Sequence, residues 1–147
     1  MSKRKVALIT GASSGIGKLS AMALANVGFD VVLAGRRKQE LEIAATEVKA
    51  FGAQALPVVA DVSEEVSVEA LFAEAVDAFG RLDLLFNNAG GNVPASDIDG
   101  LTLDQWQLVM DSIVTGTFLC TRAAFRIMKA QDPRGGRIIN NGSISAH

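Results

Sequence analysis

Five short runs of apolar residues recur along the chain, and amphipathic stretches separate them. The runs occupy residues 6–9, 31–34, 56–60, 82–86 and 138–139. Because consecutive apolar residues suit a strand that is covered on both faces, these runs predict the strands of a parallel sheet. Strands that alternate with helices predict a doubly wound, three-layer α/β fold with right-handed crossovers.

Helical spacing of apolar residues follows each of the first three runs. Each set ends at a glycine, the residue most common just past a helix end. The spacing predicts helices that bury one stripe. The predicted stripes contain Ile16, Leu19, Ala23, Leu24 and Val27 in the first helix, Leu41, Ala44, Ala45, Val48 and Phe51 in the second, and Val68, Leu71, Phe72, Ala75, Val76 and Phe79 in the third.

A longer helix is predicted over residues 102–129, after a loop over residues 90–100 and before the last strand. Its apolar residues cover more than one face. A helix that is apolar on two sides must be covered twice, so we expect the sheet on one side and a second subunit on the other. The apolar residues are Trp106, Val109, Met110, Ile113, Val114, Phe118, Cys120, Phe125 and Met128.

Composition indicates one globular domain over residues 1–147, with 49% hydrophobic and 20% charged residues. The formal net charge of −2, without a basic block, argues against nucleic acid or an anionic membrane as the main partner. No apolar run approaches the length of a membrane span, and the apolar residues before Gly11 are too few for a signal peptide. The single cysteine cannot form a disulfide within the chain, which fits a reducing compartment. We therefore expect a cytoplasmic protein.

A glycine-rich turn, with Gly11, Gly15 and Gly17, directly follows the first predicted strand and opens the first helix. Glycines there permit a tight turn and let the backbone approach a pyrophosphate, while the helix N-terminus attracts its charge. The spacing Gly-x-x-x-Gly-x-Gly differs from the commonest dinucleotide fingerprint. A flexible turn is the alternative, but the position in a βαβ pattern favours a nucleotide site.

The residues just past the other strands are also polar or glycine-rich. Ligands of open α/β sheets bind outside the carboxyl ends of the strands, so these residues are expected to converge on one crevice. Polar loops are common on protein surfaces, which explains any one of them, but less readily a doubled asparagine that runs into glycine. The residues are Arg36, Asp61, Asn87, Asn88, Ala89, Gly90 and Ser143.

Together these motifs resemble the short-chain dehydrogenase/reductase family. Residues 10–17, Thr-Gly-Ala-Ser-Ser-Gly-Ile-Gly, are similar to that family's first signature, and residues 87–90, Asn-Asn-Ala-Gly, to its second. Asp61-Val62 resembles the family's adenine-contacting pair, and Ser143 falls where the family carries its catalytic serine. The resemblance covers essentially all of the chain. It implies a Rossmann-type fold with strand order 3-2-1-4-5.

The resemblance also implies which residues hold a dinucleotide. Asp61 and Val62 would contact the adenine. Ser14 occupies a position where many NADP-dependent members have a basic residue. The pyrophosphate side would be held by Gly11, Ser13, Gly15, Ile16 and Gly17, and the ribose next to the adenine by Asn88, Ala89 and Gly90.

The end of the second strand bears on which nucleotide binds. NAD sites usually carry an acid there for the ribose 2′-hydroxyl, but here Gly35 is followed by Arg36 and Arg37. A guanidinium can bind a 2′-phosphate, in a pair worth about 4 kcal/mol before desolvation at ~4 Å and an effective dielectric of ~20. We therefore expect NADP(H) to be preferred, with NAD(H) possible, and Ser13 within reach of the phosphate. The alternative is that both arginines are solvated residues at a helix start.

At the reacting centre, the resemblance implies that Ser143 orients the substrate oxygen, with Ser145 a weaker candidate. A hydroxyl that only caps local backbone is the alternative for Ser143. The family's relay asparagine aligns with Ile113, which cannot pass a proton. Some family reductases of unsaturated acyl thioesters also lack that asparagine. Asp111 and Ser112 are close in sequence but are expected on other faces of the helix.

The family's Tyr-x-x-x-Lys motif would begin beyond residue 147, and the chain contains no tyrosine. We therefore expect an oxidoreductase that moves hydride between a nicotinamide and a carbonyl/alcohol substrate, with these 147 residues inactive alone. Alternatives are an enoyl-type reductase and, if 147 residues is the true length, a non-catalytic nucleotide-binding protein. A homodimer or homotetramer through helix 102–129 is expected. His147 is expected to be a loop end, Cys120 a core residue, and no metal is expected.

Overall fold

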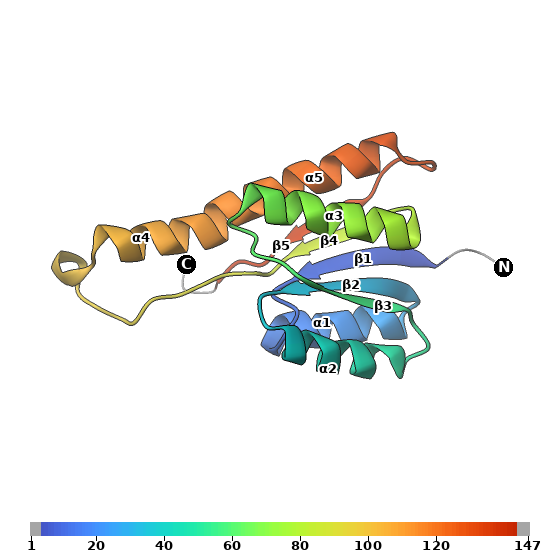
Figure 1. The fold of residues 1–147 in the computed structure, drawn as a ribbon, viewed down its shortest axis with the longest axis horizontal. Coiled ribbons are helices and arrows are strands. Elements are labelled where there is room, and N and C mark those ends of the chain that lie inside the picture. Colours follow the sequence, from blue (N-terminus) through green and yellow to red (C-terminus); the bar gives the residue numbers. More distant parts are fainter. Residues whose placement is uncertain (1–3, 144–147) are drawn as a thin grey trace.

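The computed structural model describes residues 4–143, which form one parallel sheet with helices on both faces (Figure 1). The strand order is β3-β2-β1-β4-β5, as the sequence predicted. Every neighbouring pair is parallel. The strands are β1 (Lys5–Thr10), β2 (Phe29–Gly35), β3 (Ala55–Val59), β4 (Leu84–Asn87) and β5 (Arg137–Asn140).

Two layers of helices cover this sheet. In Figure 1, α1 (Gly15–Asn26) and α2 (Lys38–Lys49) lie on one side, and α3 (Glu65–Phe79) and α5 (Gly116–Ala130) lie on the other. The second layer continues α5 backward through a π-helical turn, η2 (Asp111–Thr115), into α4 (Leu103–Met110). A short 3-10 turn, η1 (Ile98–Gly100), precedes α4.

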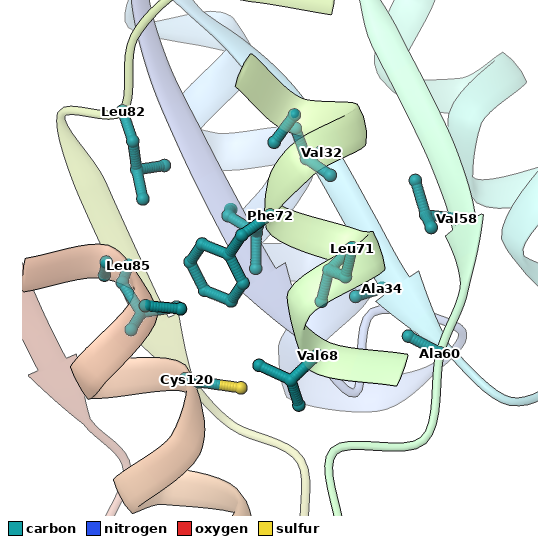
Figure 2. Close-up of a cluster of buried hydrophobic side chains, with 14 of the residues drawn as sticks. Val32, Ala34, Val58, Ala60, Val68, Leu71, Phe72, Leu82, Leu85 and Cys120 are labelled. Atoms are coloured by element: carbon teal, nitrogen blue, oxygen red, sulfur yellow. The ribbon is translucent and has the colours of Figure 1, made fainter. Parts of the chain in front are cut away.

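The core between the sheet and α3/α5 follows the predicted pattern. Figure 2 shows Phe72 of α3 among side chains from the strands, with Cys120 of α5 at the edge of the same cluster. Cys120 is 1% exposed, and burial raises the pKa of its thiol to about 12. Its predicted role as a core residue agrees with this position. The predicted stripe of α3 is buried except for Val76, which is half-buried.

The predicted face of α1 is wrong except for Leu24, which is partly buried and packs against the core. Ile16, Leu19 and Val27 are 61%, 64% and 69% exposed, and the buried residues of α1 are small ones: Gly17, Ala21 and Ala25. A helix that follows the glycine-rich turn approaches the sheet closely, so small side chains occupy the contact. The prediction used the helical spacing of apolar residues, whereas this contact excludes large side chains. In the second helix, Phe51 is also exposed, because α2 ends before it.

Strand β5 differs from the expectation of a strand covered on both faces. Ile138 packs against the core, whereas Ile139 is 48% exposed. Within the described residues β5 pairs on one side only, with β4. Its apolar run was therefore read correctly as a strand but wrongly as a fully buried one.

The long helix spans Leu103–Ala130, close to the predicted 102–129, and is long and apolar enough to cross a membrane by length and composition. The sequence had indicated no such stretch. One helix of this kind is weak evidence, because a core helix of a soluble protein passes the same test. Here one face of α5 packs into the core, through Leu119, Cys120, Ala123, Ala124 and Met128. The opposite face exposes Val114, Phe118 and Phe125.

Candidate functional site

A cleft of about 750 Å³ runs along the carboxyl ends of the strands. In the sheet register Thr10 lies opposite Ala34 and Ile9 opposite Phe86, so β1, β2 and β4 end at the same level. The predicted residues that line the cleft are Gly11, Ser13, Ser14, Ile16, Arg36, Arg37, Asp61, Val62, Asn88, Ala89 and Gly90. The expected convergence of five separate segments is therefore found for four of them.

Four predicted residues do not line this cleft, and one of these, Asn87, is buried. Gly15 and Gly17 belong to the same turn as its lining residues, and Gly17 is buried beneath it. Ser143 is exposed, beyond the end of β5. The sequence reasoning missed lining residues from three segments: Ser63, Glu64, Gly91, Asn92, Leu108, Asp111 and Ser112.

Close packing in the glycine-rich turn explains its glycines. Gly11 has φ +62°, in the left-handed region that favours glycine. At Gly17 a Cβ would overlap the carbonyl oxygen of Gly11 and lie 2.6 Å from Nδ2 of Asn88. Ser14 stands at the N-cap of α1, but its side chain makes no capping hydrogen bond. The first N–H groups of the helix are therefore available to an anion.

Thr10 joins this turn to the loop after β4. Its side-chain oxygen accepts hydrogen bonds from the backbone N–H of Asn88 at 3.0 Å and of Ala89 at 2.9 Å, and its hydroxyl donates to the carbonyl of Phe86 at 3.4 Å. Asn88 also bonds to the glycine-rich turn: its Nδ2 donates hydrogen bonds to the carbonyls of Thr10 and Gly11 at 3.3 and 3.4 Å. Thr10 is 2% exposed, so two loops of the cleft are fixed by one buried hydroxyl.

The two asparagines after β4 have different surroundings. Asn87 is buried, and its Nδ2 donates to Oγ1 of Thr121 at 3.1 Å and to Oδ1 of Asn140 at 3.0 Å. It therefore ties β4 to α5 and β5. Asn88 lines the cleft, and its Oδ1 accepts a hydrogen bond from Nδ2 of Asn141 at 2.8 Å. Of this pair, only Asn88 is placed to meet a ligand.

Arg37, at the N-cap of α2 and two residues past the end of β2, reaches across to the glycine-rich turn. Its Nη2 donates to the hydroxyl oxygens of Ser13 at 3.0 Å and Ser14 at 2.8 Å, and its Nη1 lies 3.5 Å from Oε1 of Glu40. The sequence placed Ser13 within reach of the phosphate but predicted no contact between Ser13 and an arginine. One guanidinium and two hydroxyls therefore meet at the rim of the cleft.

Asp61 carries a negative charge into the same cleft. Its Oδ1 accepts hydrogen bonds from the hydroxyl of Ser63 at 2.6 Å and from the backbone N–H of Ser63 at 3.0 Å. The Ser63 hydroxyl contributes most to lowering the pKa of Asp61 below its ordinary value. The Ser63 N–H and the charge of Arg36 lower it further, against an opposing effect of burial. The carboxylate is therefore ionised at neutral pH.

The π-helical turn changes which residues of the long helix face the cleft. The N–H of Gly116 donates to the carbonyl of Asp111, five residues back. Asp111 and Ser112 both line the cleft and Ile113 does not, so the two residues lie on another face than Ile113, as expected. A sequence pattern read at 3.6 residues per turn cannot register such an inserted residue. Ile113 lines a separate groove on the outer side of the helix.

Metal-ligating side chains do not cluster in the described part of the chain: no group of three His, Cys, Asp or Glu residues there could hold an ion. Ser145 and His147 lie outside the described residues.

Comparison with known proteins identifies the family. Residues 5–147 match the short chain dehydrogenase family, and the chain belongs to it. Its members are NAD(P)-dependent oxidoreductases. This confirms the resemblance and the fold inferred from the sequence.

Among curated relatives, a 3-oxoacyl-[acyl-carrier-protein] reductase of Synechocystis sp. is 39% identical over 96% of the chain and 56% of its own length. A probable 2,4-dienoyl-CoA reductase of Bacillus subtilis is 38% identical over 90% of the chain and 52% of its own length. The chain thus spans about half the length of these relatives.

Two solved structures show the same arrangement of elements. NAD⁺-bound xylitol dehydrogenase superposes with a TM-score of 0.93 at 34% identity, over 98% of this chain and 55% of that one. An alcohol dehydrogenase from the archaeon Thermococcus sibiricus, complexed with 5-hydroxy-NADP, gives a TM-score of 0.86 at 30% identity, over 92% of this chain and 57% of that one. NAD⁺ and a derivative of NADP therefore both occur among the structural neighbours.

Proposed function

We propose that the protein is an NADP(H)-dependent oxidoreductase that transfers hydride between the nicotinamide and a carbonyl/alcohol substrate, with residues 1–147 as its cofactor-binding domain. The observation that carries this proposal is the glycine-rich turn, where a Cβ on Gly17 would fill the space between Gly11 and Asn88. Family membership supports it. The nicotinamide supplies the hydride, and this chain binds and orients the dinucleotide.

The cleft offers a group for each part of a dinucleotide. Gly11, Ser13, Ser14 and the first turn of α1, from Gly15 through Ile16 to Gly17, would hold the pyrophosphate through N–H groups. Asp61 and Val62 would flank the adenine. Its ribose would rest against Asn88, Ala89 and Gly90. All but Gly15 and Gly17 line the one cleft.

The preference for NADP(H) rests on the rim at the end of β2. Arg37 with the hydroxyls of Ser13 and Ser14 provides a charged donor and two neutral ones for a phosphate. Arg36 lines the same cleft and adds a second positive charge. Gly35 precedes them where an NAD site usually carries an acid. The two arginines and two hydroxyls would bind the dianionic 2′-phosphate of NADP(H) strongly, whereas the neutral 2′-hydroxyl of NAD(H) would gain little from them.

Calorimetric titration of the unaltered protein with NADPH and NADH tests the preference. We expect tighter binding of NADPH. Arg36→Asp and Arg37→Asp should each weaken NADPH binding by at least about tenfold, the minimum for a lost charge-assisted hydrogen bond, and reverse the preference. Lys38→Asp makes the same charge change on a side chain that is 77% exposed and should have a smaller effect. Equal affinities of the unaltered protein for both nucleotides would defeat the proposal.

Catalysis needs groups from more than this cleft. Ser143 is proposed to orient the substrate oxygen, since its hydroxyl both donates and accepts. An enoyl-type reductase is the second candidate, favoured by Ile113 and by similarity to a probable dienoyl-CoA reductase. NADPH oxidation with ketones and with enoyl thioesters separates the two. It should be run on these 147 residues and on a protein that extends through any downstream Tyr-x-x-x-Lys. Turnover by the 147 residues at a comparable rate would show that the catalytic centre has been misplaced.

Assembly and location complete the proposal. We propose a homodimer or homotetramer in which a second copy covers the outer face of the long helix, where Trp106, Phe118 and Phe125 are more than half exposed. The substrate is proposed to be a small molecule, without nucleic acid or membrane as a partner, and the location cytoplasmic.

A further inference from the structure

The loop after β4 is tied to the long helix at one point. The backbone N–H of Gly91 donates a hydrogen bond of 3.1 Å to Oγ of Ser112. Upstream, Thr10 holds the N–H groups of Asn88 and Ala89. Within the described chain, Gly91–Ser112 is the hydrogen bond that links residues 90–96 to another element.

The chemistry of this serine suits holding rather than reacting. The hydroxyl proton of Ser112 is directed to the carbonyl of Val109 at 3.1 Å, and one lone pair accepts the Gly91 N–H. A serine hydroxyl has one proton and two lone pairs, so little capacity remains for a ligand. The side chain is half-buried and lines the cleft.

The backbone explains why this serine reaches the loop. The π-helical turn inserts one residue into the helix, which rotates the downstream residues relative to α4. Beyond the turn, Gly116 lies so close to the loop after β3 that a Cβ there would be 2.6 Å from Cγ2 of Val62. At Gly91 a Cβ would be 3.2 Å from Oγ of Ser112. The same helix thus contacts the loops after β3 and β4 through residues at the two ends of the π turn.

We infer that Ser112 is a positioning residue, whose hydroxyl fixes the loop over residues 88–91 as one wall of the cleft. The inference rests on the proposed function for its effect on nucleotide binding. Without Ser112 the loop would remain attached at Thr10 but would be loose beyond Ala89. A nucleotide would then have to order the wall as it binds, which lowers the affinity.

Ser112→Ala removes both hydrogen bonds, Ser112→Thr retains a hydroxyl, and Ser96→Ala makes the same deletion at an exposed loop residue. In the intact protein without nucleotide, we expect Ser112→Ala to speed hydrogen exchange of the Gly91 amide by roughly two- to tenfold, the range for one lost hydrogen bond. Ser112→Thr should restore protection, and Ser96→Ala should leave it unchanged. Unchanged Gly91 exchange in Ser112→Ala would overturn the inference.

NADPH titration of the same variants gives the second readout. We expect Ser112→Ala to raise the Kd by roughly two- to tenfold and Ser112→Thr to recover most of it. A nucleotide affinity that is equal in the unaltered protein and Ser112→Ala would also overturn the inference while leaving the proposed function intact. Failure of the unaltered protein to bind either nucleotide would instead defeat the proposed function, and the Gly91 exchange would still decide whether Ser112 holds the loop.

Discussion

Thr10→Val tests the view that one buried hydroxyl holds two walls of the cleft. The two side chains have nearly the same shape, so the substitution removes hydrogen bonds without opening a cavity. It leaves the N–H groups of Asn88 and Ala89 without their acceptor. Both residues are half-buried, so each orphaned donor should cost about 1–2 kcal/mol, toward the lower end of the range for buried groups. Burial of the added methyl offsets about 1 kcal/mol, which leaves a net loss of about 1–3 kcal/mol.

The comparison with Thr10→Ser makes this prediction sharp. If packing alone mattered, Thr10→Ser would be the more damaging change, because it deletes a buried methyl group. If the hydroxyl matters most, Thr10→Val is worse, although it adds apolar surface. Urea unfolding of the intact protein at fixed protein concentration measures the order. We expect Thr10→Val to be the less stable variant and to bind NADPH more weakly. A Thr10→Val protein as stable as the unaltered one, or more stable than Thr10→Ser, would refute the reasoning.

Three further predictions concern the turn, the core and the outer helix face. Gly17→Ala should destabilise the protein by about 1–3 kcal/mol and weaken nucleotide binding, because the turn has no room for a Cβ; Gly100→Ala, where a Cβ would have space, is the matched control in urea unfolding. Cys120 should resist a thiol reagent at pH 8 until the protein unfolds, since burial holds its pKa at about 12. Because the unfolded thiol ionises near pH ~8.5, its contribution should reduce stability as the pH rises above that value; fast labelling of the folded protein would contradict both statements. Light scattering should show an oligomer that Phe118→Glu dissociates, and a monomer at micromolar concentration would count against assembly through this helix.

The pattern of the sequence was enough to predict the strands and the location of the cleft, and the family resemblance of its motifs implied the strand order. Apolar runs and glycines just past helix ends are local signals, and a parallel sheet brings every carboxyl strand end to one edge. Residues as far apart in the chain as Gly11, Arg36, Asp61 and Asn88 could therefore be expected around one cleft, which they line. For the glycines of the turn the sequence predicted a close approach to a pyrophosphate, and the structure shows close packing of Gly17 against Gly11 and Asn88.

Tertiary structure decided what depends on close distances between elements. The buried face of α1 consists of Gly17, Ala21 and Ala25 because that helix lies too near the sheet for its larger apolar residues. The contact between Arg37 and Ser13 was not predicted, because it depends on how the chain leaves β2. Ser112 faces the cleft through a π-helical turn that hydrophobic periodicity does not register. Periodicity records which residues avoid water, whereas these three outcomes were set by how much space remains between packed backbones.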